Sequence, residues 1–144
     1  MADSVSDSIV VNATPDEIME VIADFDAYPQ WQDEVKEVEI LETDDDGWGT
    51  RVRFVITTKI ATARYVLDYT YTDDAMRWTL VEGHNVKRND GEYRLVDNGD
   101  GTTEVHYDLT LESPIKVPGV VKRQLEKRVI NTALGALKKR VESS

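Results

Sequence analysis

Six aromatic side chains fall on one face of the predicted strands and could form a single binding surface. They are Tyr65, Tyr69, Tyr71, Trp78, Tyr93 and Tyr107. An ordinary hydrophobic core could account for them, because tyrosine and tryptophan are common in β-strands. Five phenols on one face nevertheless fit a dry core poorly, because each buried hydroxyl needs a hydrogen-bond partner. The set therefore favours a cavity that holds water or a ligand, in which the phenols could bind a polar group.

Proton-transfer chemistry has few candidate groups in this sequence. An enzyme that moves protons needs a group that exchanges them near neutral pH, whereas a free phenol has a pKa of about 10. The strand alternation places Arg53, Arg64 and Asp68 on the opposite, outer face, an assignment that a one-residue β-bulge would reverse. His84 falls in a turn and His106 on the outer face. No catalytic residue is therefore predicted.

Composition excludes several other chemistries. The 144-residue chain contains no cysteine, so disulfides, thiolate zinc sites, iron–sulfur clusters and cysteine nucleophiles are ruled out. Its acidic turns lack the spacing of a calcium-binding loop and it has no glycine-rich phosphate loop, so no metal or cofactor is predicted. The formal charge of −11 opposes nucleic-acid binding. Without an apolar span or a leader, we expect no integral membrane association and a cytoplasmic location.

Charge is distributed unevenly along the chain. From Lys116 to the last residue there are eight basic and two acidic residues, a net charge of +6, which leaves −17 on the rest. The simplest interpretation is a solvated helix face that complements an acidic sheet. The alternative is a docking surface for an acidic protein partner or a membrane surface, with Lys122, Arg123 and Lys127 as its candidate residues.

The surrounding pattern predicts the elements that position these side chains. A period of two marks seven strands: Val5–Val11, Val35–Leu41, Gly49–Thr58, Ile60–Tyr71, Met76–Glu82, Val86–Val96 and Thr102–Leu111. Thr14, Pro15 and Glu17 form the cap of a first helix, and Pro29 limits a second helix to a short segment near Trp31. A long helix from Pro118 to Val141 has an apolar residue at every fourth position: Val121, Leu125, Val129, Ala133, Leu137 and Val141.

This order of elements resembles the helix-grip fold of the START-like (SRPBCC) superfamily, and most closely its small bacterial proteins of the polyketide cyclase/dehydrase or coenzyme-Q-binding type. The matching segments are Ile9–Ile18, Phe25–Trp31, Val35–Leu41, Asp90–Leu95 and Gly99–Val105. The resemblance implies one α+β domain over residues 1–144. In this fold a seven-stranded curved antiparallel sheet wraps around the long C-terminal helix, and two short helices lie between the first two strands.

The resemblance also implies a ligand cavity between the sheet and the C-terminal helix. Its predicted lining is Trp31, Phe54, Tyr65, Leu67, Tyr69, Trp78, Leu80, Asn89, Tyr93, Tyr107, Leu109, Leu125 and Val129. Asn89 stands where the nearest relatives usually have an apolar residue, so this cavity is not expected to be purely hydrophobic. The turns near Trp31, Trp48 and His84 are expected to form its rim.

Three functions are compatible with these features, because this superfamily supports several activities on one scaffold. The first is binding or carriage of a hydrophobic or aromatic small molecule of the lipid, polyketide or isoprenoid class. The second is a polyketide cyclase or dehydrase, in which Tyr65, Tyr69, Trp78 and Asn89 would orient the substrate. The third is a protein-interaction module that uses the basic C-terminal helix. The lack of a ready general base favours binding over catalysis.

Overall fold

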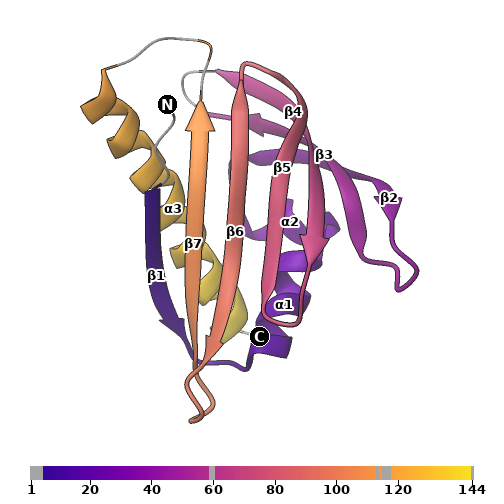
Figure 1. The fold of residues 1–144 in the computed structure, drawn as a ribbon, viewed down its shortest axis with the longest axis vertical. Helices are drawn as coiled ribbons and strands as arrows, with labels where there is room; N and C mark the ends of the chain where they lie inside the picture. The colour runs from indigo at the N-terminus through magenta and orange to yellow at the C-terminus, as the bar shows by residue number, and fades with distance from the viewer. Residues whose placement is uncertain (1–4, 59–60, 113, 115–117, 144) are drawn as a thin grey trace.

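The computed structural model describes residues 5–58, 61–112, 114 and 118–143, which form three α-helices, one 3₁₀ turn and seven strands (Figure 1). The strands are β1 (Val5–Val11), β2 (Val35–Thr43), β3 (Gly49–Thr57), β4 (Thr62–Tyr71), β5 (Ala75–His84), β6 (Arg88–Asp97) and β7 (Thr103–Glu112). The helices are α1 (Pro15–Ala23), η1 (Phe25–Ala27), α2 (Tyr28–Trp31) and α3 (Gly119–Glu142). Every predicted element is present, although Ile60 and Lys116 lie outside the described residues.

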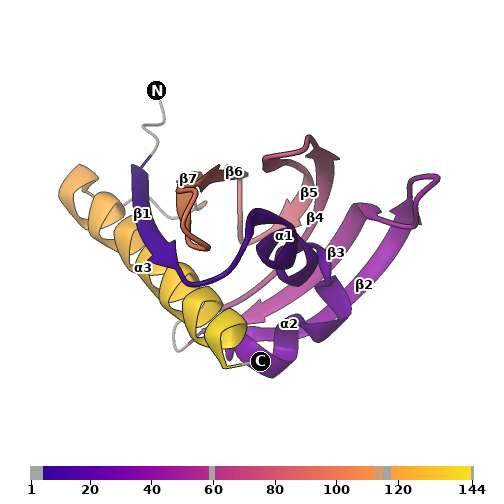
Figure 2. The same cartoon turned by 90° about the horizontal axis from the view of Figure 1, so that it is seen from below.

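The strands form one antiparallel sheet in the order β1-β7-β6-β5-β4-β3-β2. The first strand thus pairs with the last, from Val5 opposite Leu109 to Val11 opposite Thr103. Figure 2 shows that the sheet is curved and that α1, α2 and α3 all lie on its concave side. The predicted α+β architecture is confirmed, including the two short helical segments between the first two strands.

The turn from the first strand into α1 follows the predicted capping pattern. The Thr14 hydroxyl accepts a hydrogen bond from the Glu17 backbone N–H at 3.3 Å, and the Glu17 carboxylate accepts one from the Thr14 N–H at 3.3 Å. These two bonds satisfy amide donors that a helix start leaves free, and Pro15 has no N–H to satisfy. The chain then places Phe25 and Tyr28 in the core.

The charged outer face of the sheet also agrees with the predicted alternation. Arg53 pairs with Glu39 at 3.2 Å and Arg51 with Asp68 at 2.7 Å. Arg64 lies opposite Val55 in the β3–β4 register. A bulge does occur where β4 meets β5, but Leu67 and Tyr69 still face the core, so the assignment of Arg53, Arg64 and Asp68 to the outer face is confirmed.

The face that α3 buries differs from the prediction. Val121, Leu125 and Val129 were expected to be buried, but each is about 40% exposed, with values of 40%, 41% and 39%. The buried residues are instead Glu126, Ile130, Leu134, Leu137 and Val141. A step of four residues is slightly longer than a helical turn of 3.6 residues. An apolar residue at every fourth position therefore moves around the helix by about 40° at each step. Only the last members of the predicted row therefore reach the core.

Candidate functional site

Aromatic rings from four strands meet on the concave face of the sheet. Trp78 of β5 lies next to Tyr93 of β6 and Tyr107 of β7, with ring centroids 5.6 Å and 5.5 Å away. The Tyr93 and Tyr107 rings are 4.6 Å apart and nearly perpendicular. Tyr69 of β4 extends the group, 6.0 Å from Trp78. The sheet thus brings together aromatic residues that are up to 38 positions apart in the sequence.

Burial raises the pKa of every tyrosine in the chain. Loss of solvation is the largest cause for each of Tyr28, Tyr65, Tyr69, Tyr71, Tyr93 and Tyr107. A charge on Tyr107 would also raise the pKa of Tyr28, Tyr65, Tyr69 and Tyr93. The phenols are therefore near one another around Tyr107, and all stay neutral hydrogen-bonding groups at ordinary pH.

The tyrosine hydroxyls differ in whether they have a hydrogen-bond partner within the protein. Tyr28 donates to the Ile22 carbonyl and Tyr71 to the Gly49 carbonyl. Tyr69, Tyr93 and Tyr107 have buried rings, but their hydroxyls form no hydrogen bond to any of the described residues. In that part of the chain the only fully buried side-chain nitrogen or oxygen without a hydrogen bond is the Trp31 Nε1. The three hydroxyls are therefore not completely enclosed, and their hydrogen-bonding capacity remains available to water or a ligand.

Asn89 is the polar side chain expected in the otherwise hydrophobic and aromatic lining. Its side chain is buried, and its Oδ1 accepts a hydrogen bond from the Trp78 Nε1 at 3.0 Å. The same side chain interacts with the Tyr65 hydroxyl. The Trp78 ring lies across Gly91, its strand partner, where a larger residue would collide with it. Trp78 is thus held in one orientation at the centre of the aromatic group.

The remaining predicted lining residues divide into two groups. Phe54, Leu67 and Leu109 are buried on the concave face, and Leu80 is partly buried against them. Leu125 and Val129 are exposed on the first half of α3, away from the buried core. The strands therefore bring the predicted aromatic and aliphatic residues together, whereas α3 does not bury its two predicted members beside them.

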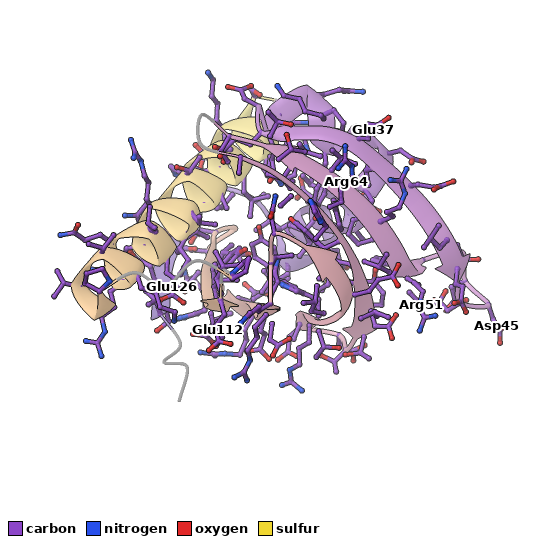
Figure 3. All side chains as sticks on the ribbon, turned by 90° about the horizontal axis from the view of Figure 1, so that it is seen from above. Glu37, Asp45, Arg51, Arg64, Glu112 and Glu126 are labelled. Carbon is purple, nitrogen blue, oxygen red and sulfur yellow. The ribbon has the colours of Figure 1, made fainter. Side chains whose placement is uncertain are left out.

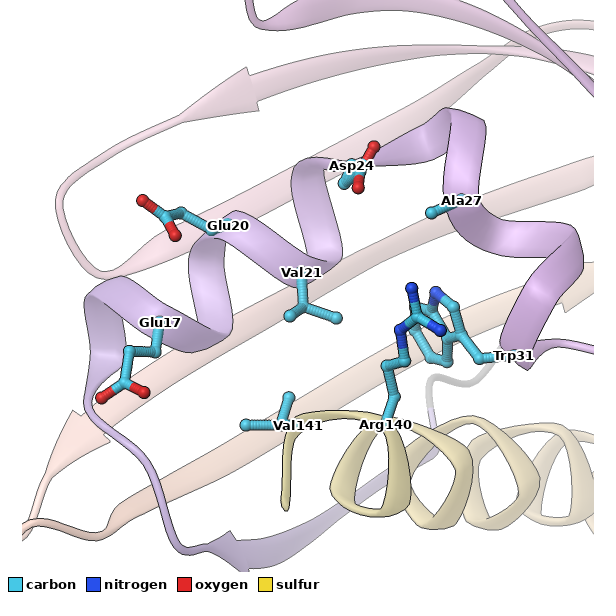
Figure 4. A pocket seen from close by; sticks show the side chains of 8 residues that line it. All are labelled: Glu17, Glu20, Val21, Asp24, Ala27, Trp31, Arg140 and Val141. Atoms are coloured by element: carbon cyan, nitrogen blue, oxygen red, sulfur yellow. The ribbon is translucent and has the colours of Figure 1, made fainter. Parts of the chain in front are cut away.

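Trp31 lies at a separate pocket between the short helices and the end of α3 (Figure 4). This pocket has a volume of about 300 Å³. Its lining comprises Glu17, Glu20, Val21, Asp24, Ala27, Trp31, Arg140 and Val141. Arg140 donates a hydrogen bond to Gln30 at 3.1 Å, which ties the end of α3 to α2. The Trp31 ring also packs on Tyr28, with centroids 5.2 Å apart, so Trp31 links this pocket to the aromatic core.

A second pocket lies over β3, β4 and β5 and has a volume of about 340 Å³. Its lining comprises Arg53, Arg64, Tyr65, Val66, Glu82, Gly83 and His84. Gly83 is the strand partner of Tyr65, so the sheet has no side chain opposite that phenol. The pocket therefore touches the phenol group at Tyr65 and includes His84, one of the predicted rim residues.

Glu126 is a buried carboxylate that the sequence analysis did not identify. It is 1% exposed on α3 (Figure 3). Its Oε2 accepts a hydrogen bond from the Leu111 backbone N–H at 3.1 Å, and its Oε1 lies 3.4 Å from the Lys122 Nζ. Ile130, Leu134, Leu137 and Val141 continue its row at true helical spacing, which is the signal that could have revealed it.

Replacing Glu126 by alanine is expected to lower the free energy of unfolding by roughly 1–3 kcal/mol, because the Leu111 N–H would lose its acceptor in a buried position. Glu126→Gln keeps a carbonyl oxygen at that place and should cost less. Urea unfolding of both variants measures the difference. Equal losses in the two variants would mean that the hydrogen bond to Leu111 is not what stabilises this end of α3.

Asp7 is a second carboxylate that the sequence analysis passed over. It lies directly opposite Tyr107 in the β1–β7 register, so its side chain leaves the sheet on the same face as that phenol. Asp7 is partly buried, between the exposed Ser6 and Ser8. Its Oδ1 accepts a hydrogen bond from the Ser8 N–H at 2.8 Å. Of the carboxylates at strand positions that face the concave side, Asp7 is the one nearest to Tyr107 by register.

The family assignment follows from a match over almost the whole chain. The sequence profile of a family described as "Polyketide cyclase / dehydrase and lipid transport" matches residues 2–142. The chain belongs to this family. The predicted membership of the START-like superfamily is thereby confirmed, and no curated protein matches the chain.

Solved structures share the fold of this family member. A START superfamily protein from Mycobacterium smegmatis is 26% identical, with 97% of each chain covered and a TM-score of 0.90. The Zhui aromatase/cyclase from Streptomyces sp. R1128 is 18% identical over 99% of this chain and 94% of its own, with a TM-score of 0.80. A STAR-related lipid transfer protein from Xanthomonas axonopodis is 18% identical over 96% and 85%, with a TM-score of 0.75.

None of the helices among the described residues is long and apolar enough to cross a membrane. Among the same residues, no three histidine, aspartate or glutamate side chains gather in a way that could hold a metal ion. The candidate site therefore consists of the aromatic group, Asn89 and the two neighbouring carboxylates, Asp7 and Glu126.

Proposed function

We propose that this protein binds and carries a hydrophobic or aromatic small molecule of the lipid, polyketide or isoprenoid class in the cytoplasm. The observation that carries the proposal is the state of Tyr69, Tyr93 and Tyr107: their rings are buried, and their hydroxyls have no hydrogen-bond partner among the described residues. A ligand with an apolar body and a polar oxygen would satisfy both requirements at once.

The neutral state of the phenols supports binding of an uncharged polar group. Because burial raises their pKa, these hydroxyls can donate a hydrogen bond to a carbonyl or accept one from a hydroxyl. Asn89 adds a fixed amide next to Trp78. A quinone, a polyketide carbonyl or a lipid ester would each offer the acceptor oxygen that such donors fit. The family description, which includes lipid transport, agrees with this class of ligand.

Catalysis as a polyketide cyclase or dehydrase is the second candidate, and Asp7 is the observation that favours it. Apart from Asp97 at the exposed end of β6, the inward positions of β3 to β7 have no ionisable side chain other than tyrosine, so a proton-transfer step needs a group from elsewhere. Asp7 faces the same side as Tyr107 and could serve as that base. Glu126 is a poorer candidate, because both of its oxygens already have partners.

Binding can be tested with Nile red and with native mass spectrometry of protein purified from its own host. Nile red should bind and be displaced by a lipid extract of that host. Tyr107→Phe removes one available hydroxyl and should weaken binding of an oxygen-bearing ligand by about fivefold, the effect of one hydrogen bond. Tyr28→Phe is the matched control, because the Tyr28 hydroxyl is already bonded to the Ile22 carbonyl.

The two candidates give different results for a substitution at Asp7. If the protein is a carrier, Asp7→Asn should leave ligand affinity within about twofold of the wild type, since an amide is nearly isosteric with the carboxylate. If it converts a polyketide-like chain, the same variant should bind the chain but lose turnover. Failure of Nile red and of any co-purified molecule to bind the folded protein would contradict both candidates.

A further inference from the structure

Exposed aliphatic side chains are concentrated on the first half of α3. Among the described residues, eight large hydrophobic side chains are markedly exposed, and four of them lie between residues 120 and 129. Val120 is the most exposed, at 70%, and Val121, Leu125 and Val129 follow at about 40%. The other four, Val10, Leu41, Val81 and Val96, lie on separate strands. A cluster of this kind usually marks an interaction surface.

Basic side chains surround these aliphatic residues. We call the combined set the basic–apolar strip: Val120, Val121, Lys122, Arg123, Leu125, Lys127, Arg128 and Val129. Glu126, the acidic residue within this segment, is buried and paired with Lys122, so the charge that the strip presents to solvent is positive. The chain as a whole has a charge of −11, which makes this local excess of cations distinctive.

The order of residues places the charges on both sides of the apolar row. Val121, Leu125 and Val129 are four residues apart and lie along one side of the helix. At about 100° per residue, Arg128 projects just to one side of this row and Lys122 just to the other. A narrow apolar row with cationic flanks is the arrangement of helices that lie in a membrane interface, with aliphatic groups among the acyl chains and cations at the phosphates.

We propose that the basic–apolar strip docks this protein reversibly onto the surface of an anionic lipid bilayer. The cations of the strip favour binding to an anionic surface. The valine and leucine side chains favour a surface with an apolar layer beneath its charged groups, as a lipid bilayer has. A nucleic acid would satisfy the cations but leave the aliphatic row in water. The acidic remainder of the protein would be repelled by such a bilayer, so docking would turn the sheet away from it.

The end of the apolar row near the middle of α3 points to the α2 side of the helix. Arg140 follows Val129 by eleven residues, close to three turns of 3.6, so both side chains leave α3 in nearly the same direction. Arg140 bonds to Gln30 of α2, whereas Lys138, half a turn away, bonds to the Val10 carbonyl of β1. Val129 therefore projects to the α2 side of α3 and not to the β1 side. The docking proposal goes beyond the proposed carrier function and stands independently of it.

Vesicle co-sedimentation of the full chain tests the proposal. The wild type should sediment with phosphatidylcholine vesicles that contain phosphatidylglycerol, much less with phosphatidylcholine alone, and less at high salt because screening weakens the attraction. Arg128→Glu should weaken binding by about fivefold or more, because each cation near an anionic surface adds to the affinity. Val121→Asn combined with Leu125→Asn should weaken it several-fold while leaving the charge unchanged.

Two control variants separate the strip from general effects of charge and hydrophobicity. Arg94→Glu changes the net charge equally at an exposed position of β6. Val81→Asn combined with Val96→Asn removes exposed aliphatic residues elsewhere. Both controls should bind as the wild type does, and circular dichroism confirms that each variant is folded. The proposal is overturned if the wild type does not bind anionic vesicles, if a control weakens binding as much as the strip variants, or if the strip binds only an acidic protein such as polyglutamate.

Discussion

Raising the pH above about 10 is expected to unfold this protein over a narrow range, because burial disfavours ionisation of the tyrosines in the folded state. Every tyrosine has its pKa raised by burial, and Tyr107 further opposes charge on four of the others. An unfolded chain would ionise the same phenols at their ordinary pKa. Alkaline conditions therefore favour the unfolded state.

The direction and size of this effect follow from proton binding. Above the ordinary phenol pKa the unfolded chain releases its tyrosine protons while the folded chain keeps them, so stability falls as the pH rises. The contribution is complete below about pH 10 and is lost as the pH climbs towards the raised pKa of the folded state. Each phenol that stays protonated costs about 1.4 kcal/mol per pH unit, so four or more would remove a typical total stability within one to two units.

Circular dichroism and tyrosinate absorbance, recorded together during an alkaline titration, measure this transition. The two signals should change at the same pH, because the phenols ionise only when the fold opens. In Tyr107→Phe the number of protons released on unfolding should be smaller by about one, so the transition should depend less steeply on pH. If tyrosinate instead forms near pH 10 while the circular dichroism stays native, the phenols are not held in a buried environment.

Replacing Gly91 by alanine is expected to destabilise the fold by about 1–3 kcal/mol or more, through a steric conflict at the centre of the aromatic group. An added Cβ would lie 2.3 Å from the Trp78 Cζ2 and 2.8 Å from the Asp108 carbonyl oxygen. Trp78 cannot readily give way, because its Nε1 is bonded to Asn89 and its ring packs on Tyr93. The same change should therefore also disturb any ligand bound beside Trp78.

Gly135→Ala is the matched control for this substitution. Gly135 lies in α3, is exposed, and has no atom within 4 Å of an added Cβ. Alanine there should increase the free energy of unfolding by about 0.5–1 kcal/mol, because glycine loses more backbone freedom in a helix. Urea denaturation of the two variants should give opposite signs. A Gly91→Ala variant as stable as the wild type would show that Trp78 has room to move.

The local features of this protein could be predicted from the sequence because they depend on near neighbours. The Thr14–Glu17 cap acts within one helical turn, and the period of two assigns Tyr69 and Trp78 to the inner face and Arg53 to the outer face whatever the strands later pair with. These patterns also fixed the order of the elements, which was sufficient to suggest the superfamily.

The tertiary structure decided what lies against each face. Pairing of the first strand with the last places Asp7 opposite Tyr107, although they are 100 residues apart, and no local pattern contains that information. The packing of α3 selected a face that includes Glu126 and left Leu125 in solvent, because a helix buries the side that the sheet contacts. Likewise, the phenols became one group, and their pKa values rose, only when three strands curved around the same space, since desolvation depends on every element that excludes water.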